Sequence, residues 1–275
     1  MTTIENKLQQ IHERIASACA QAGRAAGSVQ LLSVSKTFGP DAVRQAVLAG
    51  ERSFGENYIQ EGVDKIAAVR AMGLPGGEAL QWHCIGPIQS NKTRLVAEHF
   101  DWAQTVDRLK IAERLSAQRP ESLAPLQVCI QLNVDGGETK AGVAPQQALE
   151  LAAAIVQLPR LALRGVMSIP DDVPGFEAQR EVHARATAVF TQIRASGLPG
   201  LERFDTVSMG MTGDLEAAVA AGSTMVRVGS GIFGQRNYAP HCPGRSWLGW
   251  RGRPPQRPPG RFIWQSVGNS TCSGV

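Results

Sequence analysis

Short apolar segments alternate with longer amphipathic segments along this chain, and the alternation restricts the folds open to it. We expect eight strands, at residues 31–35, 52–54, 81–85, 102–105, 126–133, 162–167, 206–208 and 225–228. Helix-like segments follow every strand but the last, at 40–49, 58–71, 91–99, 108–118, 145–157, 176–195 and 214–221. This order favours an α/β fold of the (β/α)₈ barrel type. A doubly wound open sheet also alternates, but it needs no eighth strand.

An additional helix precedes the first strand. Thr2 and Glu5 have the spacing of a capping box, and Gly23 is placed to end the helix. Apolar residues recur on one face at helical spacing: Ile4, Leu8, Ile11, Ile15 and Cys19. We therefore expect one domain over residues 1–238, made of this helix and the barrel.

Composition indicates an ordinary globular protein. Hydrophobic residues make up 43% of the 275 residues, yet no apolar run approaches the length of a membrane span. The first residues are polar and lack the layout of a signal peptide. We expect a cytoplasmic protein without a membrane partner.

Cysteine and histidine spacing argues against bound metal. The five cysteines are scattered without close pairs, and the five histidines show no repeated short spacing. Neither a disulfide framework nor a zinc site has this pattern. Cys84 and Cys129 lie within strand-like runs, where we expect them to pack as small hydrophobic residues.

Charge is concentrated at the C-terminal end. Of the net charge of +4, the stretch 239–275 supplies five arginines and no acid, which leaves 23 basic and 24 acidic residues in the rest. The stretch is rich in Pro, Arg and Gly without helical or strand periodicity, and we expect it to be disordered. A polyproline ligand and a cationic arm for nucleic acid are two interpretations. We favour a third hypothesis, that a GC-rich gene is read out of frame here.

A lysine ends the first predicted strand. Lys36 follows the run Leu-Leu-Ser-Val-Ser, just before Gly39-Pro40 interrupts the pattern. Burial lowers the pKa of a lysine towards the free amine, which is the form that condenses with an aldehyde. Alone, a surface lysine in the turn after a strand is the simpler interpretation.

Two glycine-containing loops strengthen the chemical interpretation. The seventh strand leads into residues 208–214 and the eighth into 229–234, both small-residue turns before helices. In such barrels the loops after strands seven and eight often hold a phosphate, with backbone amides directed at the anion. A lysine with two phosphate loops indicates an aldehyde that carries a phosphate, and this points to pyridoxal 5′-phosphate (PLP).

The segments 31–36, 54–58, 82–92, 208–211 and 227–234 together resemble the pyridoxal phosphate homeostasis protein family. That family is similar to the barrel domain of alanine racemase, of fold-type III. The resemblance implies a Schiff base between Lys36 and the cofactor aldehyde, and a position for Arg227 opposite the pyridine nitrogen. It also implies phosphate contacts from Ser208, Gly210, Gly229 and Ser230, and a cofactor contact from Met211. By the same resemblance, the pocket is lined near the cofactor ring by Asn57 and His83, with Met167 and Ser168 as walls.

Two departures from the family pattern accompany these assignments. The family commonly has threonine where Ser230 stands, and serine keeps the hydroxyl; it usually has a bulky apolar residue where Cys84 stands. Without the resemblance, His83 is more simply a buried histidine bonded to backbone, and residues 135–142 form a polar turn.

The function expected is that of a PLP-binding protein, not an enzyme, which stores and sequesters the cofactor and passes it to PLP-dependent apo-enzymes. The alternative is an amino-acid racemase, which needs a second base on the other face of the cofactor. In alanine racemase that base is a tyrosine from an added domain, and we expect nothing of that size after Tyr238. Tyr58 is the other tyrosine, and its place in a first helix turn makes it a poor substitute. Nucleic-acid binding by the tail is a third class. Without the second domain of the racemases, we expect a monomer.

Overall fold

The computed structural model describes residues 2–137 and 140–234 of the chain. The predictions made for the tail at 239–275, and for the domain boundary at 238, lie outside these residues. So does Tyr238.

Eight parallel strands close into a barrel in the order in which they occur in the sequence. Pairing of the first strand with the last closes the cylinder, with Leu32 opposite Arg227. The strands are β1 (Gln30–Val34), β2 (Ser53–Glu56), β3 (Gln81–Cys84), β4 (Trp102–Val106), β5 (Leu126–Leu132), β6 (Leu161–Ser168), β7 (Thr206–Ser208) and β8 (Met225–Val228). The predicted barrel is confirmed.

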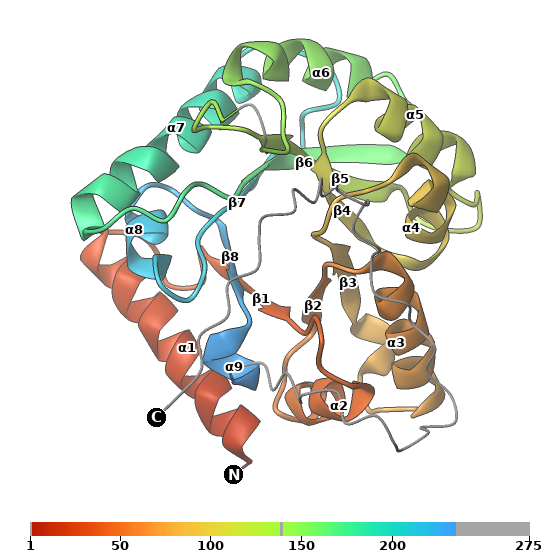
Figure 1. Ribbon diagram of the computed structural model, residues 1–275, viewed down its shortest axis with the longest axis vertical. Coiled ribbons are helices and arrows are strands. Elements are labelled where there is room, and N and C mark those ends of the chain that lie inside the picture. The colour runs from red at the N-terminus through yellow and green to blue at the C-terminus, as the bar shows by residue number, and fades with distance from the viewer. Residues whose placement is uncertain (1, 138–139, 235–275) are drawn as a thin grey trace, which may run out of the picture. The chain divides into compact units, whose positions relative to one another are not determined.

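Helices surround the strands (Figure 1). They are α1 (Thr3–Gln21), α2 (Pro40–Leu48), α3 (Ile59–Ala71), α4 (Thr93–His99), α5 (Leu109–Gln118), α6 (Ala148–Ile155), α7 (Phe176–Arg194), α8 (Leu215–Ala220) and α9 (Ser230–Phe233). Short 3₁₀ turns complete the set: η1 (Gly77–Ala79), η2 (Ser90–Lys92) and η3 (Pro145–Gln147). The expected capping box of α1 is present, because Thr2 Oγ1 accepts from Glu5 N and Glu5 bonds back to Thr2 N.

The observed helices differ from the expected ones in two ways: two of them begin as 3₁₀ turns, and a further helix follows the last strand. The segments predicted as single helices from 91 and 145 begin as the 3₁₀ turns η2 and η3, whose tighter bonding is common at helix starts. A short helix, α9, follows β8. It lies within residues 229–234, which the sequence analysis described as a small-residue turn.

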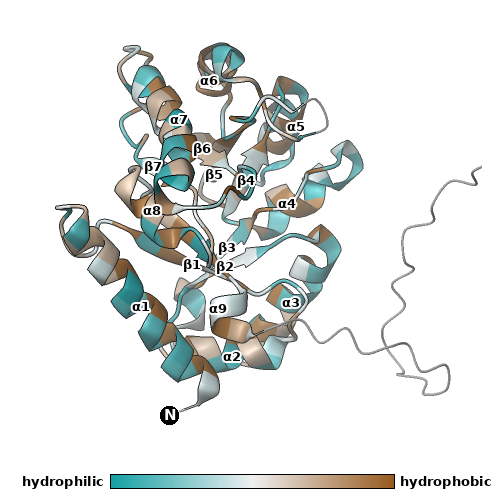
Figure 2. Cartoon of the chain, turned by 60° about the vertical axis from the view of Figure 1, so that its left-hand side comes forward, coloured by the Kyte–Doolittle hydropathy of each residue, from teal (hydrophilic) through white to brown (hydrophobic). Residues whose placement is uncertain are grey.

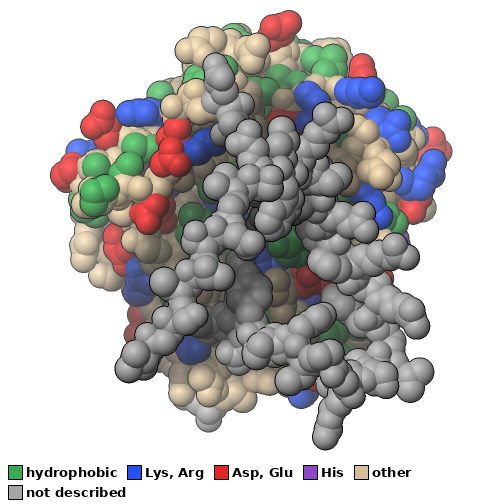
Figure 3. Space-filling view, in the orientation of Figure 1, with side chains coloured by type: hydrophobic (Ala, Val, Ile, Leu, Met, Phe, Trp, Pro, Cys, Tyr) green, Lys and Arg blue, Asp and Glu red, His purple; other side chains and the backbone are tan. Residues whose placement is uncertain are grey.

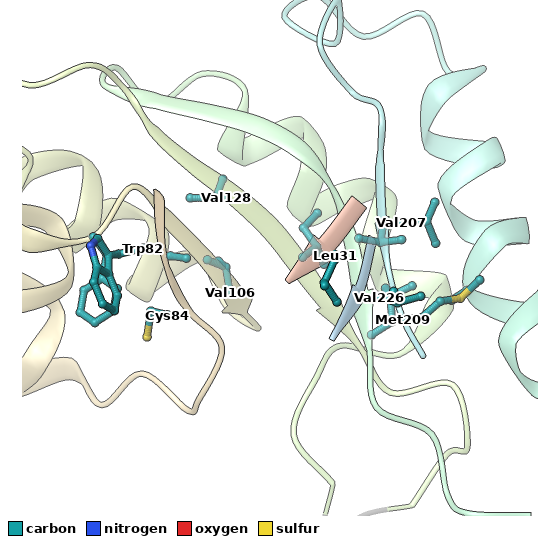
Figure 4. Packing of buried hydrophobic residues seen from close by; sticks show 14 of the residues in the cluster. Leu31, Trp82, Cys84, Val106, Val128, Val207, Met209 and Val226 are labelled. Carbon is teal, nitrogen blue, oxygen red and sulfur yellow. The ribbon is translucent and has the colours of Figure 1, made fainter. Parts of the chain in front are cut away.

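Alternate strand residues face two different environments. Trp82 and Cys84 belong to the large apolar cluster between the strands and the helices (Figure 4), whereas His83 between them is fully buried outside that cluster. Smaller clusters fill the barrel interior, and one contains Leu32, Val34, Ile85 and Met225. The helices carry hydrophobic residues for the outer cluster and hydrophilic residues for the solvent (Figure 2).

Cys84 and Cys129 are fully buried, as expected of small hydrophobic residues. Burial raises the pKa of both thiols to about 12, so neither is a thiolate at neutral pH. No helix in the described part of the chain is long and apolar enough to cross a bilayer. On the face shown in Figure 3, acidic and basic side chains are interspersed around the periphery.

Candidate cofactor site

Lys36 lies in the turn after β1. The strand ends at Val34, two residues earlier than the lysine, although Ser35 N still donates to Gly55 O at 3.1 Å. The lysine side chain is half-buried, and the next residue, Thr37, has a left-handed backbone with φ +68°. Lys36 therefore stands at the carboxyl end of the strands, the end at which barrels of this type bind ligands.

Asn57 lies directly after β2, beside the loop that leaves β3. A Cβ atom on Gly86 would lie 1.9 Å from Asn57 O, so only glycine lets the two backbones approach this closely. The side-chain oxygen of Asn57 is buried and has no hydrogen-bond partner among the described residues. A buried amide oxygen of this kind is available to a ligand.

A chain of hydrogen bonds crosses the barrel interior from β8 to β3. Arg227 Nη1 donates to Ser208 Oγ at 2.9 Å, and Nη2 donates to Ser168 O at 2.8 Å. Ser208 Oγ donates to Gln104 Oε1 at 2.7 Å, and Gln104 Nε2 lies 2.9 Å from His83 Nδ1. The barrel thus brings together four of the residues selected from the sequence, linked by Gln104, which the sequence reasoning missed.

The donor-to-acceptor direction of these hydrogen bonds determines the tautomer of His83. A guanidinium can only donate, so the Ser208 hydroxyl accepts from Arg227 and must direct its own proton to the Gln104 oxygen. The Gln104 amide nitrogen then donates to His83 Nδ1, and the imidazole proton is on Nε2. Burial, with the Arg164 charge as a second cause, lowers the pKa of His83 to about 3. His83 is therefore neutral at pH 7 and carries an N–H at a buried Nε2 that has no partner among the described residues.

Arg227 stays charged despite its burial. Removal from water lowers the pKa of its guanidinium to about 10, while Asp214 acts in the opposite direction. This value is still well above neutral pH, as the sequence reasoning assumed. Its place opposite a pyridine nitrogen stays a prediction.

The loops after β7 and β8 come into contact. Gly210 adopts φ +91°, and its carbonyl accepts from Arg227 N at 2.9 Å. Ser230 Oγ lies 3.4 Å from Thr212 Oγ1, so hydroxyls from the two loops lie side by side. The Ser208 hydroxyl bonds Gln104 and Arg227 inside the barrel, and its predicted contact with the phosphate stays a prediction. Thr212 is the residue beside Ser230. The sequence analysis selected Ser230 but missed Thr212, whose hydroxyl four residues after β7 could have suggested it.

A carboxylate fixes the shape of the first loop. Asp214 Oδ1 accepts from Met211 N at 2.5 Å, and Oδ2 lies 2.9 Å from His183 Nε2. Burial opposes ionisation of Asp214, but the bonds from His183 and Met211 outweigh it and the pKa of the carboxyl is lowered. Met211 itself is exposed, 42% by area, at the outside of the loop.

Met167 and Ser168 end β6. Met167 packs with Trp102 and Cys129 in a small interior cluster, and its role as a pocket wall stays a prediction. The Ser168 carbonyl accepts from Arg227 Nη2, while the buried Ser168 hydroxyl has no partner among the described residues. The His83 ring stacks on Trp102, with centroids 4.9 Å apart and planes 13° from parallel.

These residues fit PLP. Three buried polar atoms without partners among the described residues are Asn57 Oδ1 after β2, His83 Nε2 in β3 and Ser168 Oγ at the end of β6, and Lys36 follows β1. Glycine-containing loops lie after β7 and β8, as a phosphate requires. Within residues 2–137 and 140–234, no three His, Cys, Asp or Glu side chains form a group that could hold a metal ion.

Comparison with known proteins points in the same direction. The model of the alanine racemase N-terminal domain family matches residues 7–237. A pyridoxal phosphate homeostasis protein of Vibrio cholerae is 52% identical over 244 residues, covering 87% of this chain and 99% of that protein. The protein of the same name in Escherichia coli K12 is 48% identical over 239 residues, with the same two coverages.

One similar protein of known structure contains a bound cofactor. PipY of Synechococcus elongatus PCC7942, with PLP bound, has a TM-score of 0.67 and 35% identity, covering 80% of this chain and 100% of that one. An alanine racemase of Clostridium difficile 630 has a TM-score of 0.59 at 13% identity, which shows a shared fold alone. This chain belongs to the alanine racemase N-terminal domain family and, within it, to the pyridoxal phosphate homeostasis proteins.

Proposed function

We propose that this protein binds PLP through Lys36 at the carboxyl end of its barrel and serves to store and sequester the cofactor in the cell. The observation that carries the proposal is the placement of Lys36 after β1 together with the contacting loops after β7 and β8. The relatives named for PLP homeostasis and the PLP-bound PipY structure support it.

Each residue would make a different contribution. The Lys36 nitrogen would bond to the aldehyde carbon, and the aldehyde oxygen would leave as water. Backbone amides of Gly210 and Gly229, with the Ser230 hydroxyl, would hold the phosphate. When bound, PLP supplies a reactive aldehyde and a ring that can accept electrons from a carbanion.

Arg227 favours a carrier over a carbanion enzyme. Its guanidinium is buried and charged, and a fixed positive charge opposite the ring nitrogen would disfavour a proton there. An unprotonated ring is a weaker electron sink. The proposed site therefore holds the cofactor while it limits the chemistry for which most enzymes use it.

The racemase alternative needs a second base, and Tyr58, the tyrosine among the described residues, is not well placed to supply it. Tyr58 precedes α3 and is 58% exposed, so burial does not fix its ring over the cofactor. We therefore assign the chain a non-enzymatic role. Delivery to apo-enzymes, a cytoplasmic location and a monomeric state belong to the same proposal.

Absorbance and chemical trapping test the proposal directly. We expect the protein loaded with PLP to absorb in the visible range, and borohydride followed by peptide mapping to place the cofactor mass on Lys36. Lys36→Ala should lose this absorbance and retain noncovalent binding, because the loops after β7 and β8 are unchanged. Lys110→Ala removes an exposed lysine of α5 and is the matched control. No adduct, or an adduct confined to another lysine, contradicts the proposal.

A further inference from the structure

A second lysine lies buried directly beneath the Lys36 turn. Lys65, on α3, has a side chain only 3% exposed. Its Nζ donates to Ser35 O at 2.7 Å, to Glu56 Oε1 at 2.6 Å and to Glu61 Oε1 at 3.2 Å. An ammonium has three N–H donors, and three acceptors surround this one.

Both carboxylates also bond to the chain on either side of Lys36. Glu56 Oε1 accepts from Ser35 Oγ at 2.6 Å, and Glu61 Oε1 accepts from Thr37 N at 2.7 Å. Each of these oxygen atoms therefore joins Lys65 to one neighbour of Lys36. Ser35 O, bonded to Lys65, accepts from Phe38 N as well, at 3.1 Å, which closes the turn.

We propose that Glu56, Glu61 and Lys65 are positioning residues, here called the Lys36 clamp, which hold the backbone from Ser35 to Thr37 and so aim the Lys36 amine. Thr37 has φ +68°, a conformation that a threonine adopts only with support from its surroundings. The bond from Thr37 N to the Glu61 carboxylate supplies that support. The role of aiming the amine rests on the proposed PLP binding, whereas the hold on the backbone does not.

The geometry separates this role from that of a second cofactor lysine. The three donors of Lys65 are satisfied by protein oxygens, and its ammonium lies in contact with the fully buried Glu56 carboxylate. Burial raises the pKa of Glu56, while the Lys65 ammonium and the Ser35 hydroxyl oppose that rise. A buried cation with this set of partners stabilises a local structure and is not presented to a ligand.

Glu61 is the residue to change, because Lys65→Met would leave the Glu56 carboxylate buried without its cation and could prevent folding. Glu61→Ala removes the acceptor of Thr37 N and leaves the Glu56–Lys65 pair in place. Glu61→Gln keeps an oxygen at this position. Asp64→Ala removes an exposed carboxylate on the same helix, which accepts from Gln60 Nε2, and is the matched control.

Two measurements are made on each variant. The first is amide hydrogen exchange at Thr37 in cofactor-free protein, and the second is the rate of PLP uptake followed by absorbance. In Glu61→Ala we expect Thr37 to exchange about tenfold faster and uptake to be about tenfold slower, since a charge-assisted bond is lost. Glu61→Gln should recover part of both effects, and Asp64→Ala should match the wild type.

Failure of this inference differs from failure of the proposed function. Unchanged Thr37 exchange in Glu61→Ala, or equal effects from Asp64→Ala, would overturn the Lys36 clamp even if the wild type binds PLP on Lys36. Faster exchange with unchanged uptake would overturn its role in aiming the amine. A wild type that takes up no PLP, yet shows the expected exchange pattern, would refute the proposed function and support the hold on the backbone.

Discussion

Replacement of Gly210 by alanine should damage both the fold and the phosphate loop. Gly210 has φ +91°, and a Cβ atom there would lie 2.5 Å from Ala218 Cβ on α8. The backbone conformation costs a non-glycine residue about 1–2 kcal/mol. The forced contact adds about 1–3 kcal/mol, as overpacked cores do. We expect Gly210→Ala to lower the free energy of unfolding by roughly 2–5 kcal/mol, which corresponds to a fall in Tm of roughly 4–20 °C.

The same loop contains the control. Apart from its two chain neighbours, no described residue has an atom within 4 Å of a Cβ added to Gly213, and its φ is not positive. Gly213→Ala should therefore change stability by less than about 0.5 kcal/mol. Urea unfolding of both cofactor-free variants, with titration of PLP into each, measures stability and binding separately.

A double-mutant cycle separates the two contributions to the Gly210→Ala effect. Ala218→Gly removes the atom that the new Cβ would meet, at its own cost of about 0.5–1 kcal/mol for glycine in a helix. In the double variant the contact term should disappear, giving a coupling energy of about 1–3 kcal/mol. A coupling energy near zero, or equal losses in Gly210→Ala and Gly213→Ala, would show that the close contact is not the cause.

Other expectations concern His83, Arg227 and the absence of turnover. The pKa of His83 is about 3 in the fold and near 6.5 when unfolded, so the unfolded state binds the extra proton and stability should fall as pH drops from 6.5 to 3. His83→Gln should reduce this slope, at most about 1.4 kcal/mol per pH unit, in denaturant titrations; an unchanged slope contradicts the assignment. Arg227→Lys should cost about 1–3 kcal/mol of unfolding free energy, because a lysine cannot bond Ser208 and Ser168 in the same forked geometry; stability equal to wild type in urea would argue against this. Incubation with L-alanine and PLP should give no D-alanine above background by chiral chromatography, and rapid racemisation would restore the enzyme hypothesis.

Local pattern was enough to predict the barrel. The strands β7 and β8 begin and end where the sequence placed them, although they are short. Hydrophobic period is a property of neighbouring residues, so it can be recognised without knowledge of distant contacts. Element ends were less secure, as the early end of β1 at Val34 shows, because hydrogen bonds to other strands decide where pairing stops.

The candidate site was predictable only in part. Lys36 and the two loops were selected because strand ends in a barrel share one face, and the family resemblance assigned their roles. Gln104 and Lys65 were missed. A polar residue in a predicted strand and a lysine in a predicted helix have many possible positions, and nothing nearby in the sequence indicates which distant side chain each one meets.

Local residue pattern predicts that strands and helices alternate, that the strands close into a cylinder, and that a lysine and two glycine-containing loops gather at one end. The tertiary structure decided how buried polar atoms are paired: which way the hydrogen bonds run from Arg227 to His83, and how Lys65 holds the chain around Lys36. The physical reason is that the strand pattern depends on local periodicity, whereas a buried hydrogen bond depends on angles and on distances of a few tenths of an ångström between residues far apart in the chain.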